Sequence, residues 1–315
     1  MKFLFVKKPS RYGGALYASF KHGFEKFGHT VDLFNRENVT KDLIKKYDYT
    51  CLYTARKTKK VIKKIKKVGG SYIYFDRGYC RIKGVSLENP SAYIRISFNG
   101  WQPLKHLHKF EKKSDRWSKV CEQKIRRPQP HHKNQSCITL SPQPTKQEHE
   151  GSYILFAGSS EKYHESHGLG DPETYAVNVF NKLREHTDRP IIYRPKPSWS
   201  GKKPIPQTIY QGDAALSYPV LLDKDIYTVV THTSNASLEA NFYGIPTIVL
   251  GDAITKPLSS TKIEEINNIY RPSVGEKYKL GRALSYFQWT LAEIKNGTMW
   301  RNLKDIFEEE LSNGS

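Results

Sequence analysis

The sequence predicts an α/β protein of two domains, each built on a parallel sheet with helices packed against it. A chain of 315 residues is long for one core and suits two domains of about 150 residues each. Short apolar, β-branched runs alternate with helical patterns in both halves, as is typical of β-α-β units. A polar, Pro-rich stretch at residues 127–150 separates the halves and predicts a linker. We therefore expect domains at residues 1–145 and 150–315.

The first half has the element order of a Rossmann-like domain. It opens with an apolar strand at residues 2–7, a glycine-bearing loop at 11–14, a helix at 15–27 and a strand at 29–34. Gly13 and Gly14 do not form the GxGxxG pattern of a dinucleotide site. Further strands are expected at residues 49–54 and 71–75, and residues 93–103 predict another strand and an aromatic loop. A basic helix carrying one apolar stripe is expected at 57–68.

The second half contains the most informative segment, residues 226–251, which predicts strand, polar turn, short helix, tight turn and strand. The helix, residues 237–243, starts at the carboxyl edge of a sheet, where free N–H groups bind anions. Glu239 lies one turn into it, where a carboxylate can bond the vicinal hydroxyls of a sugar. The spacing suits a nucleotide diphosphate, and an ordinary capped helix is the alternative. Strands are also expected at 153–157 and 190–194, and residues 281–312 should be largely helical.

This segment resembles the nucleotide-sugar half-site of GT-B glycosyltransferases, whose pattern is (T/S)xSSxxLEAxxxGxP. The matching residues are Thr233, Ser234, Asn235, Leu238, Glu239, Ala240, Gly244 and Pro246. Asn235 stands where a small hydroxyl residue is commoner. The resemblance implies a GT-B fold: two Rossmann-like domains facing across a cleft, with a C-terminal helix crossing back to the first. It also implies a UDP-sugar donor, with its phosphates at Thr233, Ser234 and Asn235 and its ribose at Glu239.

The same resemblance implies further donor residues. Arg194 opens the string RPKP after the strand at 190–194, and the family presents an arginine to the donor phosphates there. Its planar guanidinium binds phosphate bidentately, and Lys196 is a second candidate. Gly158 and Ser159 follow the strand at 153–157 and are expected to face the diphosphate or sugar, with a plain turn as the alternative.

Asp76 is the candidate general base, because transfer to a hydroxyl needs a group that takes its proton. It follows the strand at 71–75 in the expected acceptor domain. Simple pairing with Arg77 or Arg81 is the alternative. If Asp76 is the base, the enzyme is expected to invert the anomeric centre.

No protein-held metal and no tightly bound cofactor are expected. His164 and His167, with Glu161 and Glu165, have metal-like spacing, but GT-B enzymes seldom hold a metal through side chains. Asp223 and Asp225 match the spacing of a DxD pattern, but that pattern belongs to a different glycosyltransferase fold. The UDP-sugar is then a co-substrate, and a divalent metal, where one is used, has no protein ligands.

The excess positive charge lies entirely in the first half. Residues 1–135 hold 32 Lys and Arg against 10 Asp and Glu, a net charge of +22, whereas the remainder holds 19 against 21. Such a domain predicts a polyanionic partner: nucleic acid first, an anionic membrane surface or acidic glycan second.

A basic acceptor half beside a donor half resembles the phage DNA glycosyltransferases. That resemblance implies transfer to 5-hydroxymethylpyrimidines, such as 5-hydroxymethylcytosine, in double-stranded bacteriophage DNA, with the target base extruded. Loop and strand residues that could contact the DNA are Arg11, Tyr12, Gly13, Arg77, Tyr79, Arg95, Asn99 and Trp101.

Two alternatives stay open. One is an envelope or capsule polysaccharide glycosyltransferase that docks on an anionic membrane through the basic helix. The other is a non-catalytic nucleic-acid-binding protein on a GT-B scaffold, against which Glu239 and Arg194 argue. The sequence has no 18-residue apolar run that predicts a membrane span. Its four cysteines lack CxxC spacing and fit a reducing cytoplasm, that of the host if a phage encodes the protein.

Overall fold

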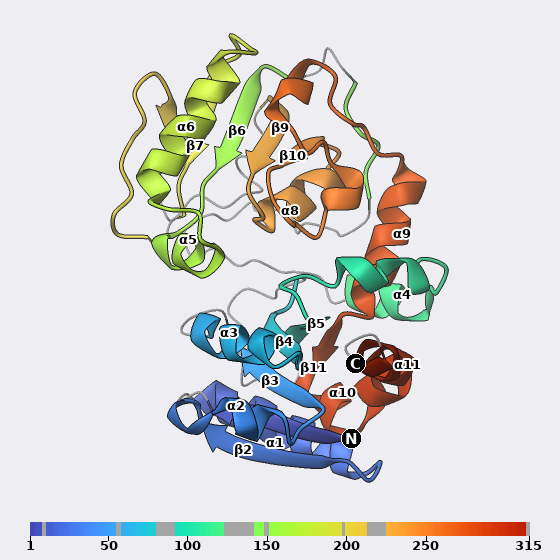
Figure 1. The fold of residues 1–315 in the computed structure, drawn as a ribbon. Helices are drawn as coiled ribbons and strands as arrows, with labels where there is room; N and C mark the ends of the chain where they lie inside the picture. The colour runs from blue at the N-terminus through green and yellow to red at the C-terminus, as the bar shows by residue number, and fades with distance from the viewer. Residues whose placement is uncertain are drawn as a thin grey trace. The chain divides into compact units, whose positions relative to one another are not determined.

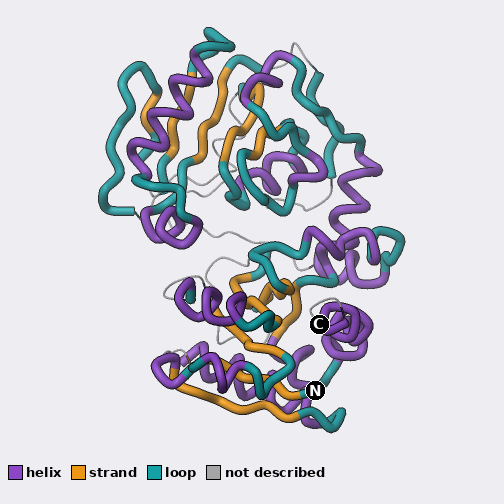
Figure 2. Tube along the Cα trace, in the orientation of Figure 1, coloured by secondary structure: helices purple, strands orange, loops and turns teal. Residues whose placement is uncertain are grey.

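The computed structural model describes residues 1–7, 11–54, 58–79, 92–122, 142–147, 151–196, 199–212 and 225–312. The chain forms two compact units. Unit 1 consists of Met1–Pro128 together with Arg282–Ser315, and unit 2 of Gln129–Gly281. Strands and helices alternate along both units (Figures 1 and 2). Unit 2 is therefore an insertion within the sequence of unit 1.

In the described part of unit 1, six strands form one sheet in the order β11-β5-β4-β3-β1-β2. The first four strands of the chain are parallel, whereas β5 runs antiparallel to β4 and to β11. This confirms the α/β class. The strands are β1 (Lys2–Lys7), β2 (Thr30–Asn35), β3 (Tyr49–Tyr53), β4 (Ser71–Arg77), β5 (Tyr93–Phe98) and β11 (Gln288–Thr290).

Helices cover both faces of this sheet. On one face, Phe3 of β1 contacts Phe20 and Phe24 of α1 and Phe307 of α11, with ring centroids 5.1 to 6.0 Å apart. On the other face, residues of α2 and α3 share a core with β1 and β3. The helices of unit 1 are α1 (Arg11–Glu25), α2 (Lys41–Ile44), α3 (Lys59–Lys67), α4 (Asp115–Glu122), α10 (Leu291–Lys295) and α11 (Thr298–Ser312), with 3-10 turns η1 (Arg36–Asn38) and η2 (Leu104–Lys109).

The basic helix α3 buries its apolar stripe in the core of unit 1. Val61, Ile62 and Ile65 are 2, 8 and 0% exposed, and they pack beneath six lysines of the same helix. Burial of an apolar face stabilises a helix more than like-charge pairs on its surface destabilise it. The stripe is therefore not available to enter a membrane, which corrects that expected role.

Residues 11–14 form the first turn of α1 rather than the expected loop. Two glycines cost about 1 kcal/mol each within a helix, but Leu16, Phe20 and Phe24 are fully buried along one face and stabilise it. Gly23 also lets α1 approach α10 closely, because a Cβ there would lie 2.0 Å from the Ile294 carbonyl oxygen.

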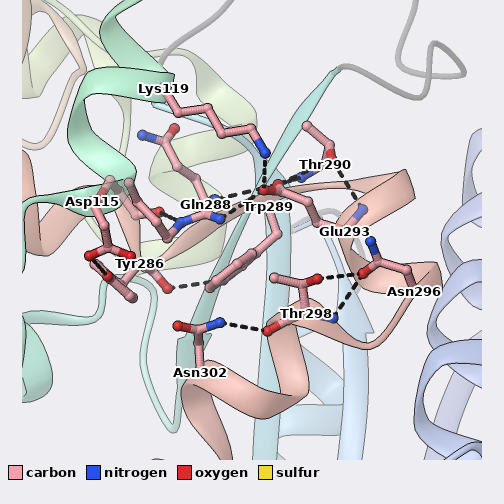
Figure 3. A network of polar contacts seen from close by, with 12 residues as sticks. Asp115, Lys119, Tyr286, Gln288, Trp289, Thr290, Glu293, Asn296, Thr298 and Asn302 are labelled. Carbon is pink, nitrogen blue, oxygen red and sulfur yellow. Dashed lines mark hydrogen bonds and ion pairs between the residues drawn. The ribbon is translucent and has the colours of Figure 1, made fainter.

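A buried polar network fastens the C-terminal segment to unit 1 (Figure 3). Arg116 of α4 is 6% exposed, and its Nη1 donates to Glu293 Oε1 at 2.7 Å. The same guanidinium donates to the backbone oxygens of Ser285 and Gln288, each at 3.1 Å, and lies 3.6 Å from the centre of the Trp289 ring. The last helices thus return to the first unit, as a GT-B fold implies.

In the described part of unit 2, five parallel strands form a sheet in the order β10-β9-β6-β7-β8. The strands expected at 153–157 and 190–194 are confirmed to within a residue, as are the two strands expected at the start and end of residues 226–251. The bounds are β6 (Tyr153–Ala157), β7 (Ile191–Arg194), β8 (Ile209–Tyr210), β9 (Ile226–Thr231) and β10 (Thr247–Val249).

Two helices pack on opposite faces of this sheet. Val179, Phe180 and Leu183 of α6 join one core cluster, while Ala236 and Ala240 of α8 join another. The described helices of unit 2 are α5 (Glu161–His167), α6 (Pro172–Arg184), α8 (Ala236–Phe242) and α9 (Val274–Ser285), the last of which ends in unit 1, with 3-10 turns η3 (Lys256–Leu258) and η4 (Ile263–Asn267).

Within the expected linker, residues 142–147 are described and are bonded to the rest of unit 2. Gln143 N donates to the Phe242 oxygen at 3.0 Å, and Lys146 N donates to the Gly244 oxygen at 2.8 Å. The buried Lys277 donates to the Gln143 oxygen at 2.8 Å. Residues 127–141 and 148–150 lie outside the described residues.

Nothing in the described ranges forms a helix long and apolar enough to cross a bilayer. Cys51 is a buried free thiol, and the other three cysteine side chains lie outside the described residues.

Candidate functional site

The donor residues expected from the sequence lie at or after the carboxyl ends of three neighbouring strands of the unit 2 sheet, with Glu239 in the helix after the third. Arg194, Ala157, Thr231 and Val249 are paired in a row across β7, β6, β9 and β10. Adjacent strands lie about 4.8 Å apart, so the row spans roughly 14 Å. Ligands bind at this carboxyl edge in open parallel sheets. We call it the donor edge, and the expected donor residues lie at or after the ends of β7, β6 and β9.

Arg194 closes β7 and is 3% exposed. Its Nη1 donates to the Gln211 oxygen at 3.3 Å, and its backbone oxygen accepts from Gly158 N at 2.9 Å. Lys196, two residues later, is exposed. The structure therefore places the hydrogen-bonded guanidinium of Arg194 beside the end of β6, with the exposed Lys196 two residues further along the chain.

Gly158 and Ser159 follow β6 at the centre of the row. A Cβ on Gly158 would lie 3.2 Å from the Tyr193 ring and 3.4 Å from Pro195 Cα, so the chain passes close to the end of β7 here. Ser160 then precedes α5 as its N-cap residue. Both serines are half-buried at the donor edge.

Residues 232–235, which we call the donor loop, join β9 to α8. Ser234 Oγ accepts from Ala236 N at 3.2 Å, and the Ser234 oxygen accepts from Ser237 N at 3.1 Å. Thr233 Oγ1 donates to the Tyr163 hydroxyl. Asn235 occupies the N-cap position without a capping side-chain bond. The loop is thus bonded both to its own helix and to α5.

Glu239 lies at the end of the first turn of α8 and is half-buried. Behind it, a buried hydroxyl and amide network fixes the helix: Asn241 Nδ2 donates to Thr247 Oγ1 at 2.7 Å, and Thr255 Oγ1 donates to Ser237 Oγ at 2.7 Å. Hydrogen bonds of this kind between buried groups rigidify their surroundings. The sequence analysis missed this network, because its members come from α8, β10 and the segment after β10.

A second group that the sequence analysis missed lies behind the donor loop. It consists of the aromatic side chains of Tyr163, His164, His167, Tyr175 and His232, which come from α5, α6 and the donor loop. The metal-like spacing of His164 and His167 has another explanation here, since His164 is buried against Tyr175 and His167 stacks on Tyr163. Among the described residues no cluster of acidic, histidine and cysteine side chains could hold a metal. Asp223 lies outside those residues.

In unit 1, Asp76 lies at the end of β4, paired with Arg95 of β5. Its Oδ2 accepts from Arg95 Nη2 at 3.1 Å and from the Tyr74 hydroxyl at 3.0 Å, while Oδ1 accepts from Arg77 N at 2.8 Å. The ion-pair partner is Arg95, whereas the alternative considered from the sequence was pairing with Arg77 or Arg81. Arg81 lies outside the described residues. Burial would lower the pKa of Arg95, but the charge of Asp76 raises it.

Three other expected acceptor residues gather around this pair. The Arg95 guanidinium lies 5.3 Å from the ring centre of Tyr79, which is buried. Trp101 packs edge-on against Tyr74 at 4.7 Å and is half-buried. Arg77 is exposed. Asp76, Arg95, Tyr79 and Trp101 thus form one cluster at the end of β4, with Arg77 beside it.

Asn99 is not part of this cluster. It follows β5 at the other end of the β4–β5 pair, where its Nδ2 donates to Glu310 Oε2 at 2.7 Å and its Oδ1 accepts from Tyr72 N at 2.8 Å. Its φ of +52° and these bonds give it a structural role in fastening α11. Arg11, Tyr12 and Gly13 lie in the first turn of α1.

The two units differ in net charge. Unit 1 holds 35 basic and 15 acidic residues, a net charge of +20, whereas unit 2 holds 16 of each. Five of the six α3 lysines are exposed. The excess positive charge found in the first half of the sequence therefore lies in the unit that contains Asp76.

Comparison with solved structures finds this architecture in two bacterial transferases. The β-Kdo 2,4 transferase of KpsC from Thermosulfurimonas dismutans is 13% identical, with 98% of this chain and 97% of that chain covered and a TM-score of 0.53. The β-Kdo 2,7 transferase of the same KpsC is 16% identical, with 90% of each chain covered and a TM-score of 0.52. No protein-family model and no curated protein matches the sequence. At this identity the likeness concerns the fold, and the chain has a GT-B fold of two Rossmann-like units with its last residues returning to the first.

Proposed function

We propose that the protein is a glycosyltransferase that moves a sugar from a nucleotide sugar to a hydroxyl group on a polyanionic acceptor. The observation that carries the proposal is the donor edge. Arg194 ends β7, Gly158 follows β6, and the donor loop with the Glu239 helix follows β9. The likeness of the fold to two sugar transferases supports it.

In the proposed reaction, the acceptor oxygen forms a bond to the anomeric carbon as the bond from that carbon to the phosphate oxygen breaks. Arg194 and the donor-loop residues Ser234 and Asn235 would stabilise charge on the departing phosphate. Glu239 would hold the ribose hydroxyls. Asp76 is the proposed base. Both of its carboxylate oxygens already accept hydrogen bonds, Oδ2 from Tyr74 and Arg95 and Oδ1 from Arg77 N, so the acceptor hydroxyl would donate to an oxygen that keeps one of these bonds.

Double-stranded DNA with 5-hydroxymethylpyrimidines is the first candidate acceptor, with a UDP-sugar as donor and the cytoplasm as the compartment. The net charge of +20 on unit 1 supports it, because phosphate neutralisation dominates affinity for a duplex. The cluster of Asp76, Arg95, Tyr79 and Trp101 would then lie where the extruded base is read.

An acidic envelope or capsule glycan is the second candidate acceptor. The specific observation in its favour is that both reported structures are Kdo transferases, and the charge of unit 1 suits an acidic glycan equally well. In this version the donor is a nucleotide-activated sugar acid. The exposed lysines of α3 would contact the acceptor or an anionic lipid surface by charge alone, since the apolar stripe of α3 is buried.

The test is a transfer assay with a panel of UDP-sugars and nucleotide-activated Kdo, offered with hydroxymethylated duplexes or with acidic oligosaccharides and read by mass spectrometry. A mass gain of one sugar names the donor and the acceptor class together. If donors bind and are slowly hydrolysed with no DNA product, the DNA version is refuted. If no nucleotide binds at all, the glycosyltransferase proposal fails and a non-catalytic scaffold replaces it.

Two variants assign the roles. Glu239→Ala should raise the donor Kd about tenfold or more, because it removes hydrogen bonds to a charged group, while Glu185→Ala on the exposed end of α6 should not. Asp76→Asn should abolish transfer and leave donor binding intact, with the exposed Asp42→Asn as its control. An active Asp76→Asn enzyme would remove Asp76 from the mechanism.

A further inference from the structure

Two tyrosine hydroxyls reach the donor loop from outside the donor motif. Tyr163 of α5 accepts a hydrogen bond from Thr233 Oγ1. The Tyr175 hydroxyl of α6 is hydrogen-bonded to His232 Nδ1 at 2.7 Å. Two consecutive residues of the loop are thus tied to two different helices.

Both tyrosines are themselves held in place by aromatic contacts. The Tyr163 ring stacks on His167, with centroids 3.8 Å apart and an interplanar angle of 18°. The Tyr175 ring meets His164 edge-on at 5.0 Å and 81°. Because neither ring can swing freely, each hydroxyl presents its bonding position to the loop at little entropic cost.

His232 is also confined from its other side. Gly251 follows β10, and a Cβ there would lie 2.5 Å from His232 Nε2. The imidazole therefore occupies the space between the Tyr175 hydroxyl and the Gly251 backbone. A side chain at position 251 would displace the ring and with it the start of the donor loop.

The protonation states suit a positional role. Burial lowers the pKa of His232 to about 4, with His167 and His164 adding to the effect, and burial raises the pKa of Tyr175 to about 12. Both partners are neutral at neutral pH. The pair consequently adds a directed hydrogen bond to the donor edge rather than a charge.

We propose that Tyr163 and Tyr175 are positioning residues that hold the donor loop in its nucleotide-binding shape before the nucleotide arrives. The inference rests on the proposed function, because it concerns the same donor edge. A loop ordered in advance does not have to be ordered on binding, so each side chain that is already immobilised adds to the affinity. Loss of either hydroxyl should therefore raise the nucleotide Kd about 3- to 10-fold.

The experiment measures nucleotide affinity by calorimetry with UMP, UDP, CMP and CDP, using the tightest-binding member for all variants. Tyr163→Phe and Tyr175→Phe should each raise the Kd about 3- to 10-fold, and raise KM for the donor with little change in kcat. Tyr243→Phe, an exposed tyrosine beside α8, is the control and should leave the Kd unchanged. Hydrogen exchange of residues 232–237 without ligand should speed up in both test variants.

A double-mutant cycle separates this role from a general loss of stability. If Tyr163 acts through Thr233, then Tyr163→Phe should have no further effect on the Kd in a Thr233→Val background. Unchanged Kd values in both single Phe variants, or equal effects of Tyr163→Phe in the two backgrounds, overturn the inference. Absence of nucleotide binding by the unaltered protein instead refutes the proposed function, so the two failures are distinguishable.

Discussion

Replacing Arg116 by methionine should destabilise unit 1 by about 3 kcal/mol. Removing one partner of a buried ion pair costs about 3–5 kcal/mol, and Arg116 and Glu293 are both buried, 2.7 Å apart. Methionine fills much of the space, and Glu293 keeps three donors, which are Lys119 Nζ at 3.2 Å, Thr290 N at 2.9 Å and Thr290 Oγ1 at 3.1 Å. The lower end of the range therefore applies. For a unit of this size 1 kcal/mol corresponds to about 2–4 °C, which gives a fall in Tm of roughly 6–12 °C.

Urea unfolding followed by tryptophan fluorescence measures this loss, because four of the five tryptophans lie in unit 1. Lys119→Met is the matched control, since that side chain is 60% exposed and should cost less than about 1 kcal/mol. Burial raises the pKa of Glu293, but bonding to Arg116 outweighs burial and lowers it. The Arg116 contribution is therefore present above the ordinary glutamate pKa and lost as pH falls below it. A loss under 1 kcal/mol at neutral pH, equal to that of Lys119→Met, would refute the reasoning.

Three further predictions concern acid stability, backbone strain and charge. The pKa of His232 in the folded protein, about 4, lies below its ordinary value, so as pH falls from about 6.5 to 4 the unfolded chain binds a proton that the folded protein does not. Unit 2 should therefore lose up to about 2 kcal/mol of stability over this range. The His232→Asn variant should not show this loss, so its plot of Tm against pH should be flatter. Gly244→Ala should lower the free energy of unfolding by over about 2 kcal/mol, because φ is +90° and the new Cβ would lie 2.4 Å from a backbone oxygen. Gly170→Ala, where φ is +75° and the space is open, should lower it by only about 1–2 kcal/mol. Equal losses of Tm in the two variants would show that the clash at Gly244 does not matter. Replacing both Lys63 and Lys67 of α3 by glutamine should weaken binding to a DNA duplex and reduce the slope of log affinity against log salt concentration by about two. The same change at two exposed lysines of unit 2 should have no such effect. Equal slopes in the two double variants would show that α3 does not contact the polyanion.

The elements that the sequence predicted well are those whose pattern is local. The β-branched runs of β9 and β10 and the stop at Gly244 are visible in any short window, so their bounds matched closely. β11 could not be foreseen, because Gln288–Thr290 lies in a helical pattern and becomes a strand only by pairing with β5. The first turn of α1 was misassigned because its glycines suggested a loop, while its stability comes from tertiary packing.

The candidate site divides in the same way. The donor edge was predictable because successive parallel strands place their carboxyl ends together, so Arg194 and the donor loop had to share one edge. The partner of Asp76 was not predictable, because Arg95 reaches it only through the antiparallel register of β5. Tyr163 and Tyr175 share no spacing with the donor motif, and only the packing of α5 and α6 brings them to it.

The return of residues 282–315 to unit 1 has a consequence for how the protein is made. Phe3 and Phe24 are synthesised before unit 2, but Phe307, which covers them, is synthesised after it. At about 5–20 residues per second, the ribosome needs roughly 8–30 s to go from residue 128 to the start of the C-terminal segment at residue 282. During that time the nascent N-terminal half carries an uncovered aromatic face and an unpaired β5 edge, while the contiguous unit 2 can already fold. A fragment of residues 129–281 should therefore fold when expressed alone, whereas residues 1–128 should stay chaperone-bound until 282–315 is supplied in trans; a stably folded 1–128 fragment would contradict this order.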